Sequence, residues 1–333
     1  MSKRLLWLSI PFREPYTTAA GMVRARDLVL VRLEEDDGIV AYGEASPFEQ
    51  YDGVTIAEVA RAFHGEVPPP PQVHAADEMA FMDLEGRRLG VPVAEPRVAT
   101  VPVNYTLAGA TPEDVARSAA DAAAAGYDCF KLKVGLVDDE ARVAAVRDAV
   151  GPDALLRVDA NGAWTVVEAI ERIRRLAPYV LEFVEQPCST LEQMAEVRTE
   201  LGVRIAADES VQNAADAIAA GDANACDIVA VKLAQMGGVS AARAAIAAAR
   251  ESGMEPYVSS SLDGPWGIAA GLQLAAAEGI TLHCGLATLE LFDAALAAAL
   301  PAPEGGRLAV PPGPGLGVEV PEEAIAEVLV QEL

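Results

Sequence analysis

The sequence predicts an α/β protein, a modified TIM (β/α)8-type barrel that carries an α+β capping domain. Two observations predict this fold class. The chain has 333 residues, and a barrel of about 250 residues with a smaller appendage fits that length better than two equal domains. From about residue 100 to 295, a unit of roughly 23 to 28 residues repeats, with a short β-branched run, a polar loop and an alanine-rich amphipathic stretch. A closed parallel barrel requires eight such units.

The repeats place the catalytic barrel at residues 99–300. Residues 1–98 lack the repeat and are expected to form the capping domain, to which the segment 301–333 is expected to return. Each predicted barrel strand is a short apolar run followed by a polar loop. These eight runs begin near Val101, Cys129, Leu155, Leu181, Arg204, Asp227, Glu255 and Thr281.

Two of the predicted helices have clear starting signals. Thr111 precedes Pro112, and Thr165 precedes the predicted helix 166–176 in the same way. A threonine side chain can accept a hydrogen bond from the free amides of a first helical turn, and proline fits the first helical position. We therefore expect both threonines to be helix N-caps.

The capping domain has different local signals. Residues 28–33 and 39–42 look like two strands, and the residues 34–38 that join them predict a hairpin. Residues 76–89 predict a helix that ends at Gly90. Together these elements predict an α+β unit over the barrel mouth.

The composition excludes several classes of partner. A formal net charge of −25 would repel nucleic acid and anionic lipid surfaces. A membrane span would need a run of about eighteen apolar residues, and the sequence contains no such run, so we expect no span. The four cysteines are far apart in the chain, which is typical of a reduced, cytoplasmic protein. We expect a small-molecule partner, and the acidic surface leaves homo-oligomer formation open.

Lysine is rare in this chain. Only four of the 25 basic residues are lysines. Arginine stays protonated in proteins, whereas a buried lysine can act as a base when its pKa is lowered. The lysines are therefore candidates for chemistry. They are Lys3, Lys131, Lys133 and Lys232.

Charged residues recur at the ends of the predicted strands two to six. Lys131 and Lys133 are two apart on one strand and should share a face, where we expect each to lower the pKa of the other. Lys232 ends the sixth strand, roughly across the barrel from Lys133. The three strands between them end in carboxylates, and catalytic groups of such barrels lie at this edge. The carboxylates are Asp159, Glu185 and Asp208.

This residue pattern predicts a metal-assisted proton transfer. Three convergent carboxylates would repel one another, and a hard divalent cation with oxygen ligands relieves that repulsion. Oxygen ligands favour Mg²⁺ or Mn²⁺ over zinc. A proton next to a carboxylate is weakly acidic, and a nearby lysine could remove it while positive charge stabilises the product.

The pattern resembles the enolase superfamily, and the opposed lysines resemble its muconate-lactonizing subgroup. The likeness covers nearly the whole chain, including the segments 10–13, 42–47 and 82–86. It implies that the three carboxylates bind the metal, Lys133 is the base, and Lys232 lies on the other face of the substrate. It also implies that Lys131 tunes Lys133, while Asn161 and Glu209 contact the ligands without binding the metal.

Within this subgroup, the segments 258–263, 267–272 and 284–288 resemble the o-succinylbenzoate synthase family. The resemblance implies a carbon–oxygen lyase of menaquinone biosynthesis. In that family, one lysine removes the ring proton and then protonates the departing hydroxyl group. The expected contacts to the substrate come from a loop at residues 17–21 and from donors in later strands. They are Thr18, Gly237, Gly238, Ser260 and Ser261.

Related reactions stay open, because the same two lysines also serve N-acylamino acid racemases and muconate cycloisomerases. The serines at the seventh strand end disfavour members that place a catalytic histidine there, and the missing Asp-x-Asp weakens a dipeptide epimerase. His283 ends the predicted eighth strand without an evident acidic partner. A non-catalytic barrel that binds a small ligand is the alternative from a different functional class.

Overall fold

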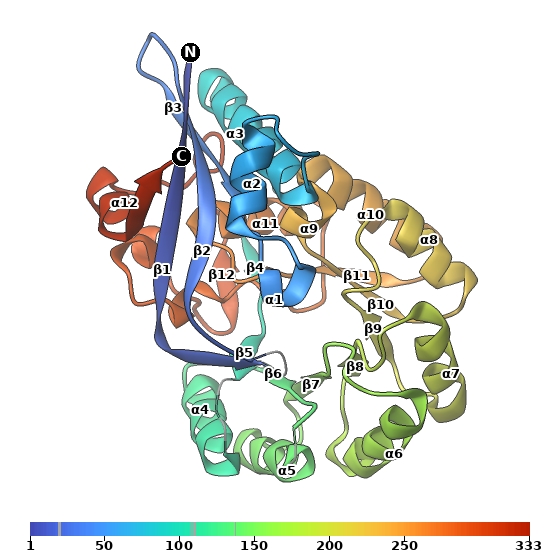
Figure 1. Ribbon diagram of the computed structural model, residues 1–333. Coiled ribbons are helices and arrows are strands. Elements are labelled where there is room, and N and C mark those ends of the chain that lie inside the picture. Colours follow the sequence, from blue (N-terminus) through green and yellow to red (C-terminus); the bar gives the residue numbers. More distant parts are fainter. Residues whose placement is uncertain (19–20, 108, 110, 137) are drawn as a thin grey trace.

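The computed structural model describes residues 1–18, 21–107, 109, 111–136 and 138–333. It contains a parallel sheet curled into most of a barrel and an antiparallel sheet beside its mouth (Figure 1). The predicted combination of a modified barrel with an α+β cap is therefore confirmed. Among these described residues, no helix has both the length and the apolar character that crossing a bilayer requires.

The cap is built on a four-stranded antiparallel sheet. The predicted hairpin is present, because β2 (Gly21–Glu34) pairs with β3 (Val40–Ala45). The long strand β1 (Ser2–Thr18) pairs with β2, and β13 (Leu329–Glu332) forms the other edge next to β1. The helices of this part are α1 (Glu49–Asp52), α2 (Ile56–Phe63), α3 (Pro71–Leu89) and α12 (Glu322–Val328).

The two faces of the cap sheet belong to different cores. Val29 and Val31 pack with residues of α2 and α3, whereas Leu28 and Leu30 belong to the large core that continues into the barrel. This follows from the alternation of side chains along a strand. At Gly43, a Cβ atom would overlap the backbone of α3, so glycine permits the close approach of this helix. The predicted helix end is also confirmed, since Gly90 follows α3 in the left-handed conformation.

The parallel sheet has seven strands in sequential order within the described part of the chain. Buried apolar side chains fill most of its positions. Cys129, Leu155 and Glu255 begin strands as expected. For β8, β9 and β10, the predicted starting residue lies one or two positions before the observed one. The strands are β5 (Tyr105–Leu107), β6 (Cys129–Lys133), β7 (Leu155–Asp159), β8 (Phe183–Glu185), β9 (Ile205–Ala207), β10 (Ile228–Val231) and β11 (Glu255–Val258).

The predicted eighth strand near Thr281 is not formed in the described structure. The segment makes one bridge to each neighbour, Val103 with Cys284 and Ser259 with Gly285, without the repeated pairing that defines a strand. These bridges close the sheet between β5 and β11. The predicted first strand is also displaced, because β4 (Thr100–Pro102) pairs antiparallel with β12 (Arg307–Ala309) outside the barrel.

Helices surround the curled sheet, as Figure 1 shows for those between β5 and β10. Both predicted threonine caps are confirmed, because Thr111 accepts a hydrogen bond from the Asp114 amide and Thr165 accepts one from the Glu168 amide. The α-helices are α4 (Pro112–Ala124), α5 (Asp139–Val150), α6 (Val166–Leu176), α7 (Leu191–Leu201), α8 (Ala214–Asp222), α9 (Leu233–Met236), α10 (Val239–Glu251) and α11 (Pro265–Ala277). Short 3-10 turns are η1 (Ala177–Tyr179), η2 (Leu289–Leu291) and η3 (Ala295–Ala299).

Candidate active site

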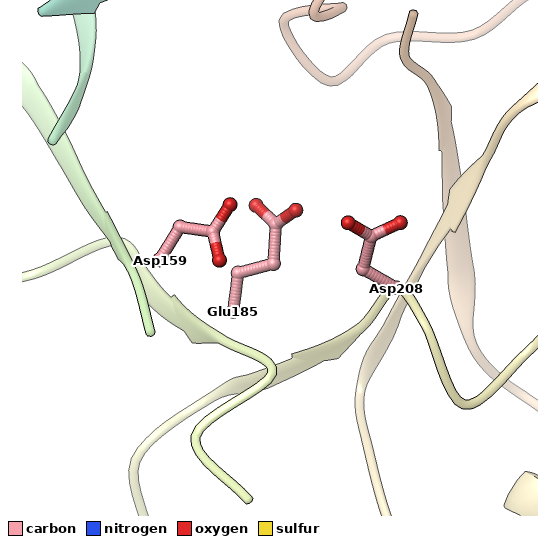
Figure 2. A group of neighbouring side chains, drawn as sticks. All are labelled: Asp159, Glu185 and Asp208. Carbon is pink, nitrogen blue, oxygen red and sulfur yellow. The ribbon is translucent and has the colours of Figure 1, made fainter. Parts of the chain in front are cut away.

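Three carboxylates meet at the carboxyl ends of adjacent strands. Asp159 ends β7, Glu185 ends β8, and Asp208 directly follows β9. Figure 2 shows Glu185 between the two aspartates. All three are buried, and one oxygen of each lies within 4.8 Å of those of the others. The parallel register brings them together because consecutive strands end at the same edge of the sheet.

These acids fit a divalent cation. Burial raises the pKa of Glu185, and the charges of Asp159 and Asp208 raise it further. The buried Oε2 atom of Glu185 lies 2.6 Å from the Lys131 amine, yet it is outside hydrogen-bond geometry. A hard cation among three oxygen donors would satisfy that atom and relieve the repulsion. Carboxylate ligands of this kind favour Mg²⁺ or Mn²⁺ over zinc.

Two lysines approach this cluster from β6. The Lys131 amine lies 2.9 Å from Oδ2 of Asp159 and also pairs with Glu185. The Lys133 amine lies 2.6 Å from the same Asp159 atom and donates to Oδ1 of Asn161 at 2.9 Å. The alternation along β6 therefore brings both amines to one end of the acid row.

The third lysine lies at the other end of the row. The Lys232 amine is 2.7 Å from Oδ2 of Asp208 and 3.9 Å from the centre of the Tyr51 ring. The Tyr51 hydroxyl donates to Oδ1 of Asp208 at 2.9 Å. Lys133 and Lys232 thus contact opposite ends of the acid cluster, and a residue of the cap reaches one of those ends.

The net pKa shifts of the two lysines on β6 are upward, although Lys131 lowers the pKa of Lys133 as expected. Burial lowers the pKa of Lys133, and Lys131 lowers it further, but the charge of Asp159 more than offsets both, so the pKa is raised. For Lys131, burial is likewise outweighed by Asp159 and Glu185, and the pKa is well above its ordinary value. Attraction by the carboxylates is thus stronger than repulsion between the two amines.

Asn161 connects the base end of the site to Glu209. Its side-chain amide donates to Oε1 of Glu209 at 2.9 Å, and its backbone amide donates to Oδ1 of Asp159 at 2.9 Å. Its φ of 45° is in the left-handed region, where asparagine is tolerated better than most residues. Burial raises the pKa of Glu209 to about 7, and Asp208 and Asp159 contribute to the rise.

A cavity of about 210 Å³ lies over these groups. One side is the pocket wall, defined as residues 259–262, which includes the predicted Ser260 and Ser261. Oγ of Ser260 lies 2.9 Å from Oγ1 of Thr288, and Oγ of Ser261 is buried without a hydrogen-bond partner. The cap supplies further lining residues that sequence reasoning missed. They are Tyr16, Phe48, Gln50 and Tyr51.

The remaining predicted contacts lie elsewhere. Gly237 and Gly238 are absent from the cavity lining and pack toward His74 and Glu78 of α3. This position gives no support to their expected substrate contact. The side chain of Thr18 is outside the described part of the chain, and so are residues 19 and 20. The expectation that His283 lacks an acidic partner is wrong, because its Nε2 atom lies 2.9 Å from Oδ1 of Asp128.

Comparison with known proteins gives a consistent family likeness. A family model described as "Enolase C-terminal domain-like" matches residues 114–324. The chain is 38% identical over 323 residues to an o-succinylbenzoate synthase of Thermobifida fusca (strain YX), which covers 95% of this chain and 90% of that protein.

Two solved structures resemble the whole molecule. An N-succinyl Arg/Lys racemase from Bacillus cereus ATCC 14579 has a TM-score of 0.93 at 25% identity, covering 99% of this chain and 98% of that one. A dipeptide epimerase from Enterococcus faecalis V583, complexed with Mg and the dipeptide L-Leu-L-Tyr, has a TM-score of 0.86 at 28% identity. That match covers 95% of this chain and 98% of the other. These relatives have different names, so likeness alone does not select one reaction.

Proposed function

The chain belongs to the enolase superfamily, and on this premise we propose that it is an o-succinylbenzoate synthase. The proposed reaction is the syn-dehydration of 2-succinyl-6-hydroxy-2,4-cyclohexadiene-1-carboxylate to 2-succinylbenzoate, a step of menaquinone biosynthesis. One observation carries the proposal of proton transfer. Lys133 and Lys232 contact opposite ends of the row of acids, so a carboxylate substrate over that row would lie between two amines.

The choice of dehydration rests on two further supports. The relative of 38% identity bears this name and is covered along 90% of its length. The pocket wall also provides hydroxyl groups where a second carboxylate of the substrate would need donors. Family membership favours an enzyme over a non-catalytic ligand-binding barrel.

The residues have distinct roles in the proposed reaction. When bound by Asp159, Glu185 and Asp208, a divalent cation would supply positive charge to the carboxylate of the substrate. Lys133 removes the proton next to that carboxylate, so the C–H bond breaks and the electron pair moves toward the carboxylate. Lys133 then returns the proton to the departing hydroxyl group on the same face, the C–O bond breaks, and water leaves.

Lys232 acts on the other face without transferring a proton. Its ammonium group lies beside Asp208 and would stabilise the negative charge that develops when the proton is removed. Lys131 lies behind Lys133, between Asp159 and Glu185. We propose that its charge adjusts the proton affinity of Lys133.

A second candidate is N-acylamino acid racemisation. The fold match to the N-succinyl Arg/Lys racemase favours it, and muconate cycloisomerisation stays open for the same pair of lysines. In a racemase, both lysines must transfer protons, one on each face of the α-carbon. In the dehydration, only Lys133 must do so.

The experiment measures both reactions with one protein preparation. Purified enzyme with Mg²⁺ and the cyclohexadiene precursor should form 2-succinylbenzoate, which ultraviolet absorbance detects. In parallel, N-succinyl amino acids in D₂O are followed by NMR and optical rotation. Aromatic product without loss of optical activity supports the dehydratase. Deuterium at the α-carbon with loss of optical rotation, and no aromatic product, would replace it with the racemase.

A further inference from the structure

A buried arginine of the cap joins the cap to the wall of the cavity. Arg26 lies on β2 and is 2% exposed. Its guanidinium group donates to four backbone carbonyls, three of them in the cap: Asp27 at 2.8 Å, Ser46 at 2.9 Å, and Pro47. The fourth is the carbonyl of Ser261 in the pocket wall, 3.1 Å away.

The same guanidinium group also contacts an aromatic residue of the cap that lines the cavity. It lies 4.8 Å from the centre of the Phe48 ring, and both Phe48 and Ser261 line the cavity. One rigid, planar group therefore sets the separation between an aromatic side chain of the cap and the serine wall of the barrel.

The pocket wall needs such support because its backbone is strained. Leu262 has a φ of 61°, in the left-handed region that side chains with a Cβ disfavour. Just beyond it, the Gly264 amide donates to Glu44 of the cap at 2.7 Å and the Gly267 amide donates to the same carboxylate at 3.2 Å. The wall is thus held on both sides of its strained residue by charged groups of the cap.

Glycine at position 264 is part of this arrangement. A Cβ atom there would lie 2.8 Å from Oε2 of Glu44, too close for a relaxed contact. Glu44 also accepts a hydrogen bond from the Ser46 hydroxyl at 2.5 Å. The cap carboxylate therefore fixes the start of α11, and Arg26 fixes the segment that precedes it.

We propose that Arg26 is a positioning residue for substrate binding, which holds the pocket wall at a fixed distance from Phe48 so that Ser260 and Ser261 face the distal carboxylate of the substrate. This role rests on the proposed function for the identity of the substrate. Within the described residues, the hydrogen bonds of Arg26 go to backbone carbonyls away from the acid cluster, so its effect should be on substrate affinity rather than on the metal.

The chain contains a matched control for this arginine. Arg147 also donates to four backbone carbonyls, those of Gly151, Ala154, Tyr179 and Val180, at 2.7 to 3.1 Å. These carbonyls precede β7 and β8, at the opposite end of the barrel from the cavity. Replacing Arg147 removes the same kind of bonds without touching the pocket wall.

The experiment compares Arg26→Lys, Arg26→Met and Arg147→Met in the full chain. Lysine at position 26 keeps the charge that faces Glu44 but reaches fewer carbonyls, so this variant should fold even if Arg26→Met does not. We expect Arg26→Lys to raise KM about tenfold and to change kcat less than about threefold. Arg147→Met should lower the melting temperature and leave KM unchanged.

Hydrogen exchange provides a measurement that needs no substrate. Amides of residues 259–267 should exchange faster in Arg26→Lys than in the wild type or in Arg147→Met. Unchanged exchange there, or an unchanged KM in an active Arg26→Lys variant, would overturn the positioning role. If the wild type acts on neither substrate, the proposed function fails, and the exchange measurement still decides whether Arg26 holds the wall.

Discussion

Asp159 pairs with two ammonium groups, because Lys131 and Lys133 approach the same oxygen at 2.9 and 2.6 Å. Burial by itself would raise the pKa of Asp159, but these two charges hold it well below its usual range. Asp159 therefore stays ionised, whereas the pKa of neighbouring Glu185 is raised. At this scale, the site is a set of charges whose protonation states depend on one another.

Removal of the Lys133 amine should abolish proton transfer. We expect Lys133→Ala to lower kcat by a factor of about 10² to 10⁴, the usual contribution of general acid–base catalysis. Formation of 2-succinylbenzoate in a spectrophotometric assay checks this. The control is Lys3→Ala, because Lys3 is an exposed lysine paired with Asp77. Equal activity of Lys133→Ala and the control would exclude Lys133 as the base.

Tyr51 makes two separate contacts at the proposed metal site: its hydroxyl bonds to Asp208, and its ring lies beside the Lys232 amine. Tyr51→Phe loses the hydrogen bond to Asp208 and keeps the ring beside Lys232. We expect a fall in Mg²⁺ affinity of about tenfold, since groups that orient ligands commonly contribute that much. Tyr51→Leu removes both contacts and should also lower kcat. Magnesium titrations of activity distinguish the two variants, and identical behaviour would show that the ring contact has no role.

The acids and lysines could be predicted from sequence because their placement follows a local rule. Alternate residues of a strand share a face, and parallel strands end at one edge. Tyr51 could not be predicted in this way, because its position over Lys232 depends on how the cap docks on the barrel. The direction of the lysine pKa shifts also depends on distances between strands, which no single segment contains.

At the scale of elements, local signals were sufficient for caps and hairpins but not for barrel closure. The threonine caps use bonds within three residues, so the local sequence determines them. The eighth strand was predicted from its apolar pattern, yet the chain there makes only the bridges at Cys284 and Gly285. Its pairing depends on two distant partners, and no local pattern reports how long that pairing continues.

Asp263, which lies two residues before α11, should make the stability of the fold depend on pH. Burial raises the pKa of Asp263 to about 7, and Glu44 adds to the rise while Arg26 and Lys232 oppose it. The folded state thus binds a proton that the unfolded chain has already released. The free energy of unfolding should therefore fall as pH rises from about 4 to 7, by about 4 kcal/mol.

Urea unfolding of the wild type and Asp263→Asn checks this expectation. Asparagine cannot ionise, so the difference in unfolding free energy between pH 5 and pH 7.5 should be smaller in the variant. Glu44 faces the same space and its pKa is also raised by burial, so part of the slope should persist. An unchanged slope in Asp263→Asn would show that this carboxyl is not the source.

At the scale of the whole molecule, the cap and the barrel share one large core. The barrel-facing side chains of β1 and β2, such as Leu8, Ile10 and Leu28, are fully buried in it. Tyr51 and Arg26 add polar links between the two parts at the cavity. We therefore expect that binding at the acid row stabilises the cap as well as the barrel.

Magnesium should raise the stability of the entire chain. A ligand that binds only the folded state at 100 times its dissociation constant adds about 2.7 kcal/mol. Thermal unfolding with Mg²⁺ should occur at a higher temperature than with EDTA. Glu185→Gln should remove most of that response, because it removes the charge of the middle acid in the row. An equal response of the variant and the wild type would place the cation elsewhere.

The way the barrel closes has a consequence for its mechanics. The two single bridges lie between β5 and β11, at the greatest distance in strand order from β8, which carries the middle acid. Transient opening begins where the fewest backbone bonds must break. Transient opening should therefore widen the barrel along this seam, beside the serines. A bulky molecule could enter there while the acids at the ends of β7, β8 and β9, across the barrel from the seam, stay in register.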